Sequence, residues 1–344
     1  MRELVVLGTA SQVPTRTRNH NGYLLRWDGE GLLFDPGEGT QRQMIHAGVS
    51  ASQITRICLT HVHGDHCYGL PGVLSRMVLD GVQHPVELHF PASGGDVVRA
   101  LVSLASPGLD LRLHPHSGPG PIAPGLEVRP LRHRIDTFGY RLAEPEGRTL
   151  LPDRLAAAGI AGPDIARLQR EGTVRGVRLA DVSVPRPGQR FAFVMDTAEC
   201  DGAGELADGV DLLVAESTFS DDDAALAARY LHLTAGQAGA LASSAGAGTL
   251  VLTHFSSRYV DVGVLAHQAV ARAGRAAAAV VAQDLDRIPL PKRQRESWLK
   301  GGLAAPAVPV SVDEDVNPGA VVGMQQDHEQ HKVEQQVYGD DVGQ

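Results

Sequence analysis

Several features are scarce or missing in this sequence of 344 residues, and each absence narrows its class. It has three cysteines, Cys58, Cys67 and Cys200, and no Cys-x-x-Cys motif, which argues against a disulfide framework and favours a reducing compartment. No apolar run approaches the length of a membrane span. The first eight residues lack the basic start and cleavage site of a signal peptide and read as a strand. We therefore expect a soluble, cytoplasmic protein.

A surplus of positive charge is also missing. The formal net charge is -9, which argues against a surface that binds nucleic acid everywhere, although it allows a local basic patch. Residues 141–178 carry seven Arg against five acidic residues, whereas residues 291–344 carry five Lys or Arg against nine acidic residues. Part of the acidity therefore lies near the C-terminus, and the middle of the chain is locally basic.

Short apolar runs of strand length alternate with stretches of helical periodicity along most of the chain. The expected strands are 4–7, 23–27, 32–34, 57–59, 86–90, 111–113, 126–131, 191–195, 212–215, 249–253 and 277–282. The expected helices are 40–47, 73–79, 97–104, 224–231, 235–244 and 264–273. Strands mixed with helices predict an α/β domain built of packed layers.

Two segments depart from this pattern. Residues 144–187 are rich in Gly, Pro and Arg and contain at most short helices, so we expect a long excursion from the core, a kind of segment that tends to be functional or disordered. Residues 291–344 have no apolar period, which predicts a disordered tail in which His328 and His331 are solvated. The prediction is one domain over residues 1–290, with an insertion at 144–187, and a tail at 291–344.

A cluster of metal-ligand residues follows the apolar run 57–59. His61, His63, Asp65 and His66 are spaced as His-x-His-x-Asp-His, and imidazole nitrogen with carboxylate oxygen suits zinc and, to a lesser degree, manganese or iron. Residues two apart in an extended segment project to the same side, so His61 and His63 can bind one ion together. Because Gly64 lets the backbone turn, the next two ligands are aimed at a second position. The alternative is a solvated histidine-rich loop.

Further candidates follow other predicted strands. His133, Asp196 and His254 come after the runs 126–131, 191–195 and 250–253, and carboxyl ends of strands are where open α/β sheets present their ligand sites. Each alone is typical of a cap or surface residue, but together with the histidine-rich loop they indicate a shared metal centre. Glu216 also ends a strand, where a carboxylate is costly unless it has a partner. For His232 the residues alone leave surface and site open.

Two histidines of the central part of the chain are assigned neither to the histidine-rich loop nor to the further candidates for the metal centre. His114 and His116 are separated by a proline near the end of a predicted strand. Structural or surface roles are favoured for both.

The motif His61 to His66 resembles the signature of the metallo-β-lactamase superfamily, and the remaining motifs narrow this to the ribonuclease Z family of tRNA 3'-processing endonucleases, in its short form. The likeness runs from about residue 2 to residue 286. It rests on these segments: Leu7-Gly8-Thr9-Ala10, Pro14, Arg18-Asn19, Phe34-Asp35-Pro36-Gly37-Glu38, Tyr68-Gly69-Leu70-Pro71-Gly72, His133, Phe138-Gly139-Tyr140, Gly162-Pro163, Asp196-Thr197, Glu216-Ser217-Thr218-Phe219, His232-Leu233-Thr234 and Thr253-His254-Phe255-Ser256-Ser257-Arg258-Tyr259.

The resemblance implies an αββα sandwich with two zinc ions per subunit at one edge, manganese being the alternative metal. It assigns His61, His63 and His133 to one ion; to the second it assigns Asp65, His66 and His254, with Asp196 between the two. It also makes Asp65 an acceptor or orienting group for the nucleophile. His232 then becomes the proton donor to the leaving oxygen, with Glu216 as its partner.

The same resemblance implies precursor tRNA as substrate, cut just after the discriminator nucleotide, and a homodimer. It makes the excursion at 144–187 a flexible arm that binds tRNA, including Gly162 and Pro163, and its surplus of Arg fits phosphate contacts. The match fades after Val174, so this arm looks trimmed. Arg18, Arg258 and Tyr259 are candidates for holding the end of the RNA.

Two other functions compete with this interpretation. The first is a hydrolase of the same superfamily acting on a small phosphodiester, such as a cyclic nucleotide, or on a thioester or lactam; the arm and the pair Glu216 with His232 argue against it. The second is an RNA-binding protein without catalytic activity, which the full set of metal ligands disfavours.

Overall fold

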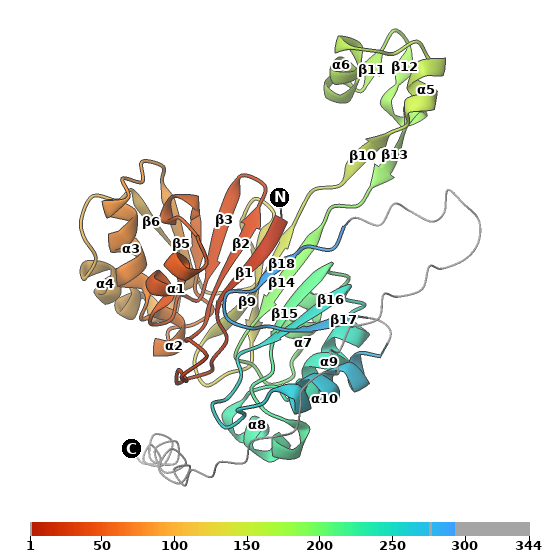
Figure 1. Cartoon of the computed structure of the whole chain (residues 1–344). Helices are drawn as coiled ribbons and strands as arrows, with labels where there is room; N and C mark the ends of the chain where they lie inside the picture. The colour runs from red at the N-terminus through yellow and green to blue at the C-terminus, as the bar shows by residue number, and fades with distance from the viewer. Residues whose placement is uncertain (1, 275–276, 293–344) are drawn as a thin grey trace, which may run out of the picture. The chain divides into compact units, whose positions relative to one another are not determined.

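The computed structural model describes residues 2–274 and 277–292, and within them two seven-stranded sheets lie face to face (Figure 1). The first sheet has the order β18-β1-β2-β3-β4-β5-β6 and the second the order β17-β16-β15-β14-β9-β8-β7. The first consists of β1 Arg2–Gly8, β2 Gly22–Trp27, β3 Glu30–Phe34, β4 Arg56–Cys58, β5 Val86–Pro91, β6 Leu111–His116 and β18 Arg287–Pro289. The second consists of β7 Gly120–Ala123, β8 Leu126–Leu131, β9 Thr137–Ala143, β14 Arg190–Val194, β15 Leu212–Glu216, β16 Thr249–Thr253 and β17 Ala278–Val281.

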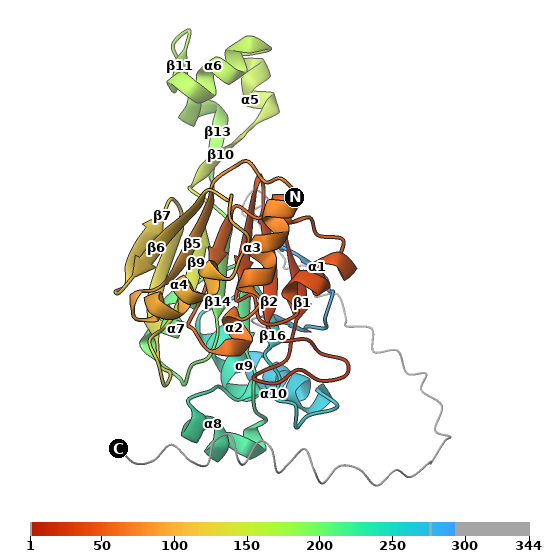
Figure 2. The same ribbon diagram turned by 90° about the vertical axis from the view of Figure 1, so that its left-hand side faces the viewer.

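Helices cover the outer face of each sheet, which gives the predicted αββα sandwich (Figure 2). The first sheet packs against α1 Thr40–His46, α3 Leu70–Leu79 and α4 Gly95–Ser103, and the second against α7 Asp201–Ala207, α9 Ala235–Ser244 and α10 Gly263–Ala273. Two further helices are α2 Gly64–Cys67, which follows β4, and α8 Ala224–Tyr230, which follows β15. The α/β fold class expected from the sequence is confirmed. None of the described helices is long and apolar enough to span a membrane.

The interior of the sandwich follows from the alternation of side chains along each strand. In β1, Leu4 and Val6 face the second sheet, whereas Val5 and Leu7 face the helices, so this strand is apolar on both sides. Between the sheets the ring of Phe34 stacks on Phe193 with centroids 4.7 Å apart. The two sheets are thus joined by a continuous apolar core.

Strand β9, which the sequence pattern did not predict, connects the second sheet to the histidine-rich loop. The N–H of Phe138 donates to the carbonyl of Thr60 at 3.0 Å, and the hydroxyl of Tyr140 donates to the carbonyl of Leu59 at 2.7 Å. Along β9, Phe138 and Tyr140 face the core in strict alternation with Gly139, where a Cβ would lie 2.4 Å from Cδ1 of Leu206. Arg141 lies on the same face as Gly139 and is buried, and its Nη1 donates to the carbonyl of Leu206 at 2.6 Å. The strand therefore carries an alternating pattern without an uninterrupted apolar run, and the sequence prediction passed over it.

The insertion between β9 and β14 forms a narrow ribbon that ends in a small helical lobe (Figure 1). The ribbon consists of β10 Gly147–Leu150 paired with β13 Ser183–Arg186, and the lobe contains α5 Pro152–Ala157, α6 Pro163–Glu171, β11 Thr173–Val174 and β12 Val177–Arg178. The lobe has an apolar core of its own, formed by Leu155, Ile160, Leu168, Val174 and Val182. The predicted tail, beyond Lys292 and including His328 and His331, lies outside the described residues.

Candidate metal centre

The predicted metal ligands converge at one edge of the sandwich because each follows a strand that ends there. His61 and His63 follow β4, His133 follows β8, Asp196 follows β14 and His254 follows β16, while Asp65 and His66 lie in α2. Side chains of seven residues thus meet: His61, His63, Asp65, His66, His133, Asp196 and His254.

Three residues at this edge have left-handed backbone conformations that non-glycine residues seldom adopt. The φ angles are 44° at Asp35, 44° at Asp196 and 61° at His254. Asp35 and His254 directly follow the strands β3 and β16, and Asp196 lies two residues after the end of β14. Strained conformations of this kind persist where the surrounding structure fixes them, and they cluster at functional sites.

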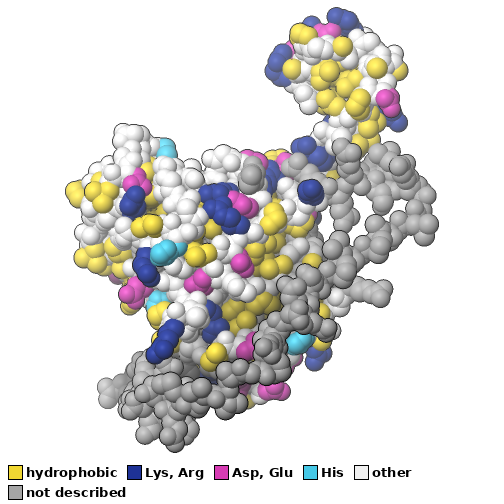
Figure 3. Space-filling view, in the orientation of Figure 1, with side chains coloured by type: hydrophobic (Ala, Val, Ile, Leu, Met, Phe, Trp, Pro, Cys, Tyr) yellow, Lys and Arg dark blue, Asp and Glu magenta, His cyan; other side chains and the backbone are white. Residues whose placement is uncertain are grey.

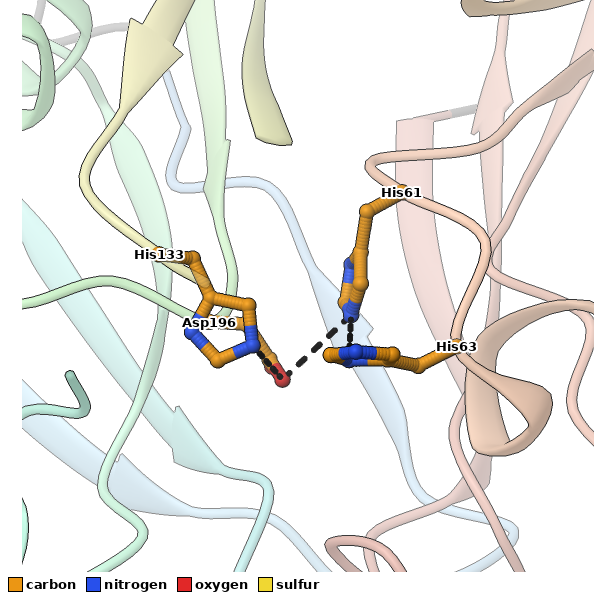
Figure 4. Close-up of side chains that lie close together, drawn as sticks. All are labelled: His61, His63, His133 and Asp196. Carbon is orange, nitrogen blue, oxygen red and sulfur yellow. Dashed lines mark hydrogen bonds and ion pairs between the residues drawn. The ribbon is translucent and has the colours of Figure 1, made fainter. Parts of the chain in front are cut away.

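The first group of ligands lies around one oxygen of Asp196 (Figure 4). Oδ2 of Asp196 is 3.6 Å from Nε2 of His61 and 3.7 Å from Nε2 of His133. Nδ1 of His63 lies 2.9 Å from Nε2 of His61. Three imidazole nitrogens and one carboxylate oxygen therefore point at a common position.

The second group lies around the other oxygen of the same carboxylate. Oδ1 of Asp196 is 3.1 Å from Nε2 of His254 and 3.4 Å from Nε2 of His66. Oδ2 of Asp65 is 3.3 Å from Nε2 of His66 and 3.6 Å from Nε2 of His254. Asp196 thus lies between the two groups, with one oxygen turned to each.

The protonation of these side chains fits a site for cations. Burial lowers the pKa of His133 to about 4, so its imidazole is neutral and keeps a free lone pair at neutral pH. Burial opposes ionisation of Asp196, but the neighbouring imidazoles, chiefly His254 and His66, outweigh it and hold the pKa of the carboxyl well below its usual range. Oδ1 of Asp196 and Nε2 of His254 are buried and have no hydrogen-bond partner among the described residues. A carboxylate oxygen and an imidazole nitrogen that are buried without a hydrogen-bond partner are atoms that a bound metal ion would satisfy.

Asp35 and Thr60 orient two of the imidazoles from behind. Oδ2 of Asp35 accepts from Nδ1 of His66 at 2.9 Å and from the hydroxyl of Thr60 at 2.7 Å. Because that hydroxyl is donated to Asp35, its oxygen is left to accept from Nδ1 of His61, 3.0 Å away. Both imidazoles are therefore held with Nε2 directed into the centre, as is usual for metal-binding histidines.

An equivalent arrangement holds the remaining ligands on the second sheet. The hydroxyl of Thr218 donates to Oε2 of Glu216 and accepts from Nδ1 of His254 at 2.8 Å. Nδ1 of His133 donates to the carbonyl of Leu231 at 3.2 Å. Leu231 ends α8 with a φ of 59°, a left-handed conformation that turns the chain between this carbonyl and the next residue, His232.

His232 lies beside the ligand cluster and is paired with Glu216. Its Nδ1 is 2.9 Å from Oε2 of Glu216, and the carboxylate is completely buried. Burial opposes protonation of His232, but the carboxylates, first of all Glu216, outweigh it and raise its pKa to about 9. Its ring centroid is 5.1 Å from that of His133 and 5.6 Å from that of His254. The neighbouring chain is fixed by Thr234, which caps α9 by accepting from the N–H of Gln237 at 3.2 Å.

The candidates for substrate binding fall into two separate places. Nη2 of Arg18 donates to the carbonyl of Tyr259 at 2.7 Å, and the hydroxyl of Tyr259 donates to Asp223. The guanidinium of Arg258 lies 5.3 Å from the ring centre of Phe219. These three candidates are therefore grouped together, whereas Gly162 and Pro163 lie at the start of α6 in the lobe of the insertion.

Several residues of the centre had no role assigned from the sequence. Asp35 and Thr218 belong to motifs of the resemblance that assign them no role. Thr60 and Leu231 have no signal beyond lying next to a candidate residue. His116 is buried against Phe138, with ring centroids 4.9 Å apart, in accord with a structural role, whereas His114 is exposed.

The fold and this cluster define a class of protein, the enzymes with a metallo-β-lactamase fold. Residues 154–255 match the family model of the Beta-lactamase superfamily domain, and residues 2–94 match the model of the anti-Pycsar protein Apyc1. The structure of human tRNase Z, short form, superposes with a TM-score of 0.59 at 25% identity, covering 84% of this chain and 99% of that chain. A long form RNase Z from yeast shares the fold with a TM-score of 0.60 at 15% identity, covering 85% of this chain and 42% of that chain.

Sequence relatives narrow the class further. The ribonuclease Z of Nocardia farcinica is 59% identical over 304 residues, covering 85% of this chain and 99% of the relative. The ribonuclease Z of Streptomyces coelicolor is 56% identical over 300 residues, covering 86% of this chain and 99% of the relative. The chain belongs to the ribonuclease Z family and is an endoribonuclease, so the resemblance found in its motifs is confirmed.

Proposed function

We propose that this protein is a zinc-dependent endoribonuclease that removes the 3' trailer from precursor tRNA. It cuts just after the discriminator nucleotide and leaves a 3'-hydroxyl on the tRNA and a 5'-phosphate on the trailer. The observation that carries the proposal is the pairing of a cluster of seven candidate ligands, buried or half-buried, with the adjacent pair His232 and Glu216 in a chain of this family. A homodimer in the cytoplasm is part of the same proposal.

The residues of the two groups fit a pair of zinc ions, with manganese as the alternative. His61, His63 and His133 would hold one ion and Asp65, His66 and His254 the other, with Asp196 shared between them. Bound there, the metal pair would lower the pKa of a water molecule to near neutrality and neutralise charge on the phosphate.

Asp65 is positioned to orient the attacking water. Its Oδ2 is held by the N–H of Gln12 at 2.9 Å, so the direction of the carboxylate is fixed by the backbone of a loop. A carboxylate that is also a metal ligand is a weak base, so orientation is its main contribution and proton acceptance a secondary one.

His232 supplies the proton that the leaving 3'-oxygen needs. Nδ1 is held by Glu216, so Nε2 is the nitrogen left to face the reacting phosphate. The carboxylate of Glu216 is itself held in place, because its Oε1 accepts a hydrogen bond from the N–H of Thr197 at 2.5 Å. A buried, fixed carboxylate favours the protonated form of its imidazole partner.

The insertion supplies the contacts to tRNA that distinguish this substrate from a small phosphodiester. Figure 3 shows basic side chains on the surface of the lobe. Arg167, Arg175 and Arg178 are exposed and make ion pairs of 2.7 to 2.8 Å with acidic neighbours in the lobe. Exposed pairs are weak, so these arginines can exchange their partners for phosphate groups.

The test is to map the product of the purified protein on a 3'-extended precursor tRNA with zinc or manganese. A single cut after the discriminator, with a 3'-hydroxyl on the tRNA, is the expected product. Hydrolysis of a small phosphodiester, thioester or lactam without cleavage of the precursor would instead indicate another hydrolase of this fold. Binding of the precursor without cleavage of any substrate, in protein that contains no metal, would indicate an RNA-binding protein.

A further inference from the structure

The loop of residues 9–21, between β1 and β2, lies directly against the metal centre. The N–H of Gln12 donates to Oδ2 of Asp65 at 2.9 Å, and Gln12 has a φ of 37°, a left-handed conformation. The carbonyl of Gln12 in turn accepts from Nε2 of His20 at 3.0 Å. The carbonyl of Thr9 accepts from the N–H of Phe255 at 2.8 Å, next to the ligand His254. The position of this loop therefore decides how Asp65 is directed.

Both ends of the loop are tied to one carboxylate that has no place in the proposed chemistry. Oδ1 of Asp284 accepts from the hydroxyl of Thr9 at 2.8 Å, and Oδ2 accepts from the N–H of Asn19 at 2.7 Å. Oδ2 also lies 3.2 Å from Nε2 of Gln43 in α1, which donates to the carbonyl of Leu7 as well. Asp284 follows β17 in the second sheet, so it links the two sheets at the point where the loop leaves and returns.

The backbone directly after Asp284 is itself fixed. The N–H of Leu285 donates to the carbonyl of Val6 at 2.7 Å, and the N–H of Val6 donates to the carbonyl of Asp286 at 2.9 Å. These bonds hold the carboxylate of Asp284 at a constant position relative to β1. A rigid acceptor that joins both ends of a loop restricts the loop far more than one bond at its tip would.

We propose that Asp284 is a positioning residue of the active site, which fixes the loop of residues 9–21 so that the N–H of Gln12 holds Asp65 in its working orientation. The same restraint places Arg18, whose Nη2 donates to the carbonyl of Tyr259. The inference rests on the proposed function for the role of Asp65, whereas the restraint on the loop follows from the hydrogen bonds alone.

The hydrogen-bonding pattern separates two substitutions. In Asp284→Asn the remaining oxygen can accept from Asn19 and Gln43, and the new amide can donate to the hydroxyl of Thr9, which is able to accept. In Asp284→Ala all three bonds are lost. Asp286→Ala is the matched control, because it removes a carboxylate two residues away that accepts from the N–H of Gln283 in its own turn.

The first measurement is limited trypsin digestion, with the fragments that end at Arg16 and Arg18 followed by mass spectrometry. These arginines lie within the loop, and cleavage there reports its local opening. Asp284→Ala should be cut at these sites roughly tenfold faster than the wild type, whereas Asp284→Asn and Asp286→Ala should be cut at close to the wild-type rate. Equal rates for Asp284→Ala and the wild type would overturn the inference.

The second measurement is hydrolysis of a small chromogenic phosphodiester by the metal-loaded enzyme, with metal content determined in parallel. Because Asp65 belongs to the reacting centre, Asp284→Ala should lower kcat by roughly tenfold or more with little change in KM, and Asp284→Asn should restore it. An unchanged kcat in Asp284→Ala, or an asparagine variant as slow as the alanine variant, would overturn the role. If Asp284→Ala does not fold, Thr9→Val removes one of the three donors and should shift both readouts in the same direction by less.

These readouts do not depend on tRNA. A wild-type protein that hydrolyses the small diester but leaves precursor tRNA intact would contradict the proposed function, while the effect of Asp284→Ala on loop and kcat would still decide the inference.

Discussion

Nδ1 of His66 lies 2.9 Å from Oδ2 of Asp35, and both side chains are completely buried. The carboxylate of Asp35 accepts three hydrogen bonds, because its oxygens also face the N–H and the hydroxyl of Thr60, each at 2.7 Å. All of these groups are donors in the observed arrangement. Asp35 therefore fixes the tautomer of the candidate ligand His66 directly and that of His61 through Thr60.

Asp35→Asn should weaken metal binding, since the NH2 group of asparagine would face a partner that also donates a hydrogen bond. Loss of such a partner commonly lowers metal affinity by roughly 10 to 100-fold. The measurement is zinc content after dialysis against a graded chelator, with Asp110→Asn as the control, an exposed carboxylate paired with Arg112. Metal retention equal to that of the wild type would show that Asp35 has no part in orienting the ligands.

His63→Ala should lower metal occupancy and abolish cleavage of precursor tRNA, because it removes a nitrogen donor from the first group of ligands. His267→Ala, at an exposed position of α10, is the control for losing an imidazole elsewhere. Metal content by mass spectrometry and a gel assay of the precursor measure the two effects. A variant that keeps both would exclude His63 from the site.

His232→Ala should keep the metals and slow cleavage, because the imidazole contributes a proton rather than a lone pair. The loss should be roughly two to four decades in kcat if His232 is the general acid. Single-turnover kinetics on the precursor, with metal content measured on the same sample, test this. Since His232 also lies near Asp196 and His254, a variant that loses metal would instead assign it to the ligand set.

The sequence predicted the layered fold and grouped the ligands because both depend on local signals. Apolar runs of strand length remain strands in the sheets, and seven candidate ligands stand at the ends of such runs, so they meet at one edge. Strand β9 was missed because no uninterrupted apolar run marks it: its core-facing residues alternate with Gly139 and Arg141, whose places are decided by contacts with Leu206 in another element.

The supporting residues could not be predicted for a similar reason. Asp35 precedes His66 by 31 residues, and Asp284 follows Thr9 by 275 residues, so their hydrogen bonds exist only once the sheets have assembled. The left-handed conformation of Leu231 carries no signal in a leucine, a residue that rarely adopts it. The roles of these residues depend on partners that are distant in the sequence, whereas the candidate ligands can be recognised from their own residue types and spacing.

His89 and His116 should make the fold sensitive to acid. Burial lowers the pKa of each to about 4; His114 and Arg56 add to the effect at His89 while Glu87 opposes it, and His89 adds to it at His116. Below pH 6.5 both imidazoles bind a proton in the unfolded chain, whereas in the folded protein they stay neutral until the pH reaches about 4. Their contribution to the free energy of unfolding is therefore complete above pH 6.5 and is lost as the pH falls toward 4.

The test of this pH dependence is urea unfolding of metal-free His116→Leu at pH 7.5 and pH 5. The ring of His116 packs edge-on against Phe138 and Tyr140, so leucine suits the site. Between the two pH values the wild type should lose about 2 kcal/mol more of its free energy of unfolding than the variant. The control His267→Gln should lose as much free energy of unfolding as the wild type. An equal loss in His116→Leu would show that His116 is not a source of the acid sensitivity.

Removal of the insertion should separate tRNA cleavage from the chemistry of the centre. Gly147 and Arg186 are paired across β10 and β13, so residues 148–185 can be replaced by a two-residue turn that closes the ribbon without moving β9 or β14. The lobe packs on its own apolar core, and none of the seven ligands lies within the removed segment. Cleavage of precursor tRNA should fall by roughly 100-fold or more, with a weaker salt dependence, because phosphate contacts are lost. Metal content and hydrolysis of a small phosphodiester should be retained, and equal loss on both substrates would show that the insertion supports the centre itself rather than the RNA.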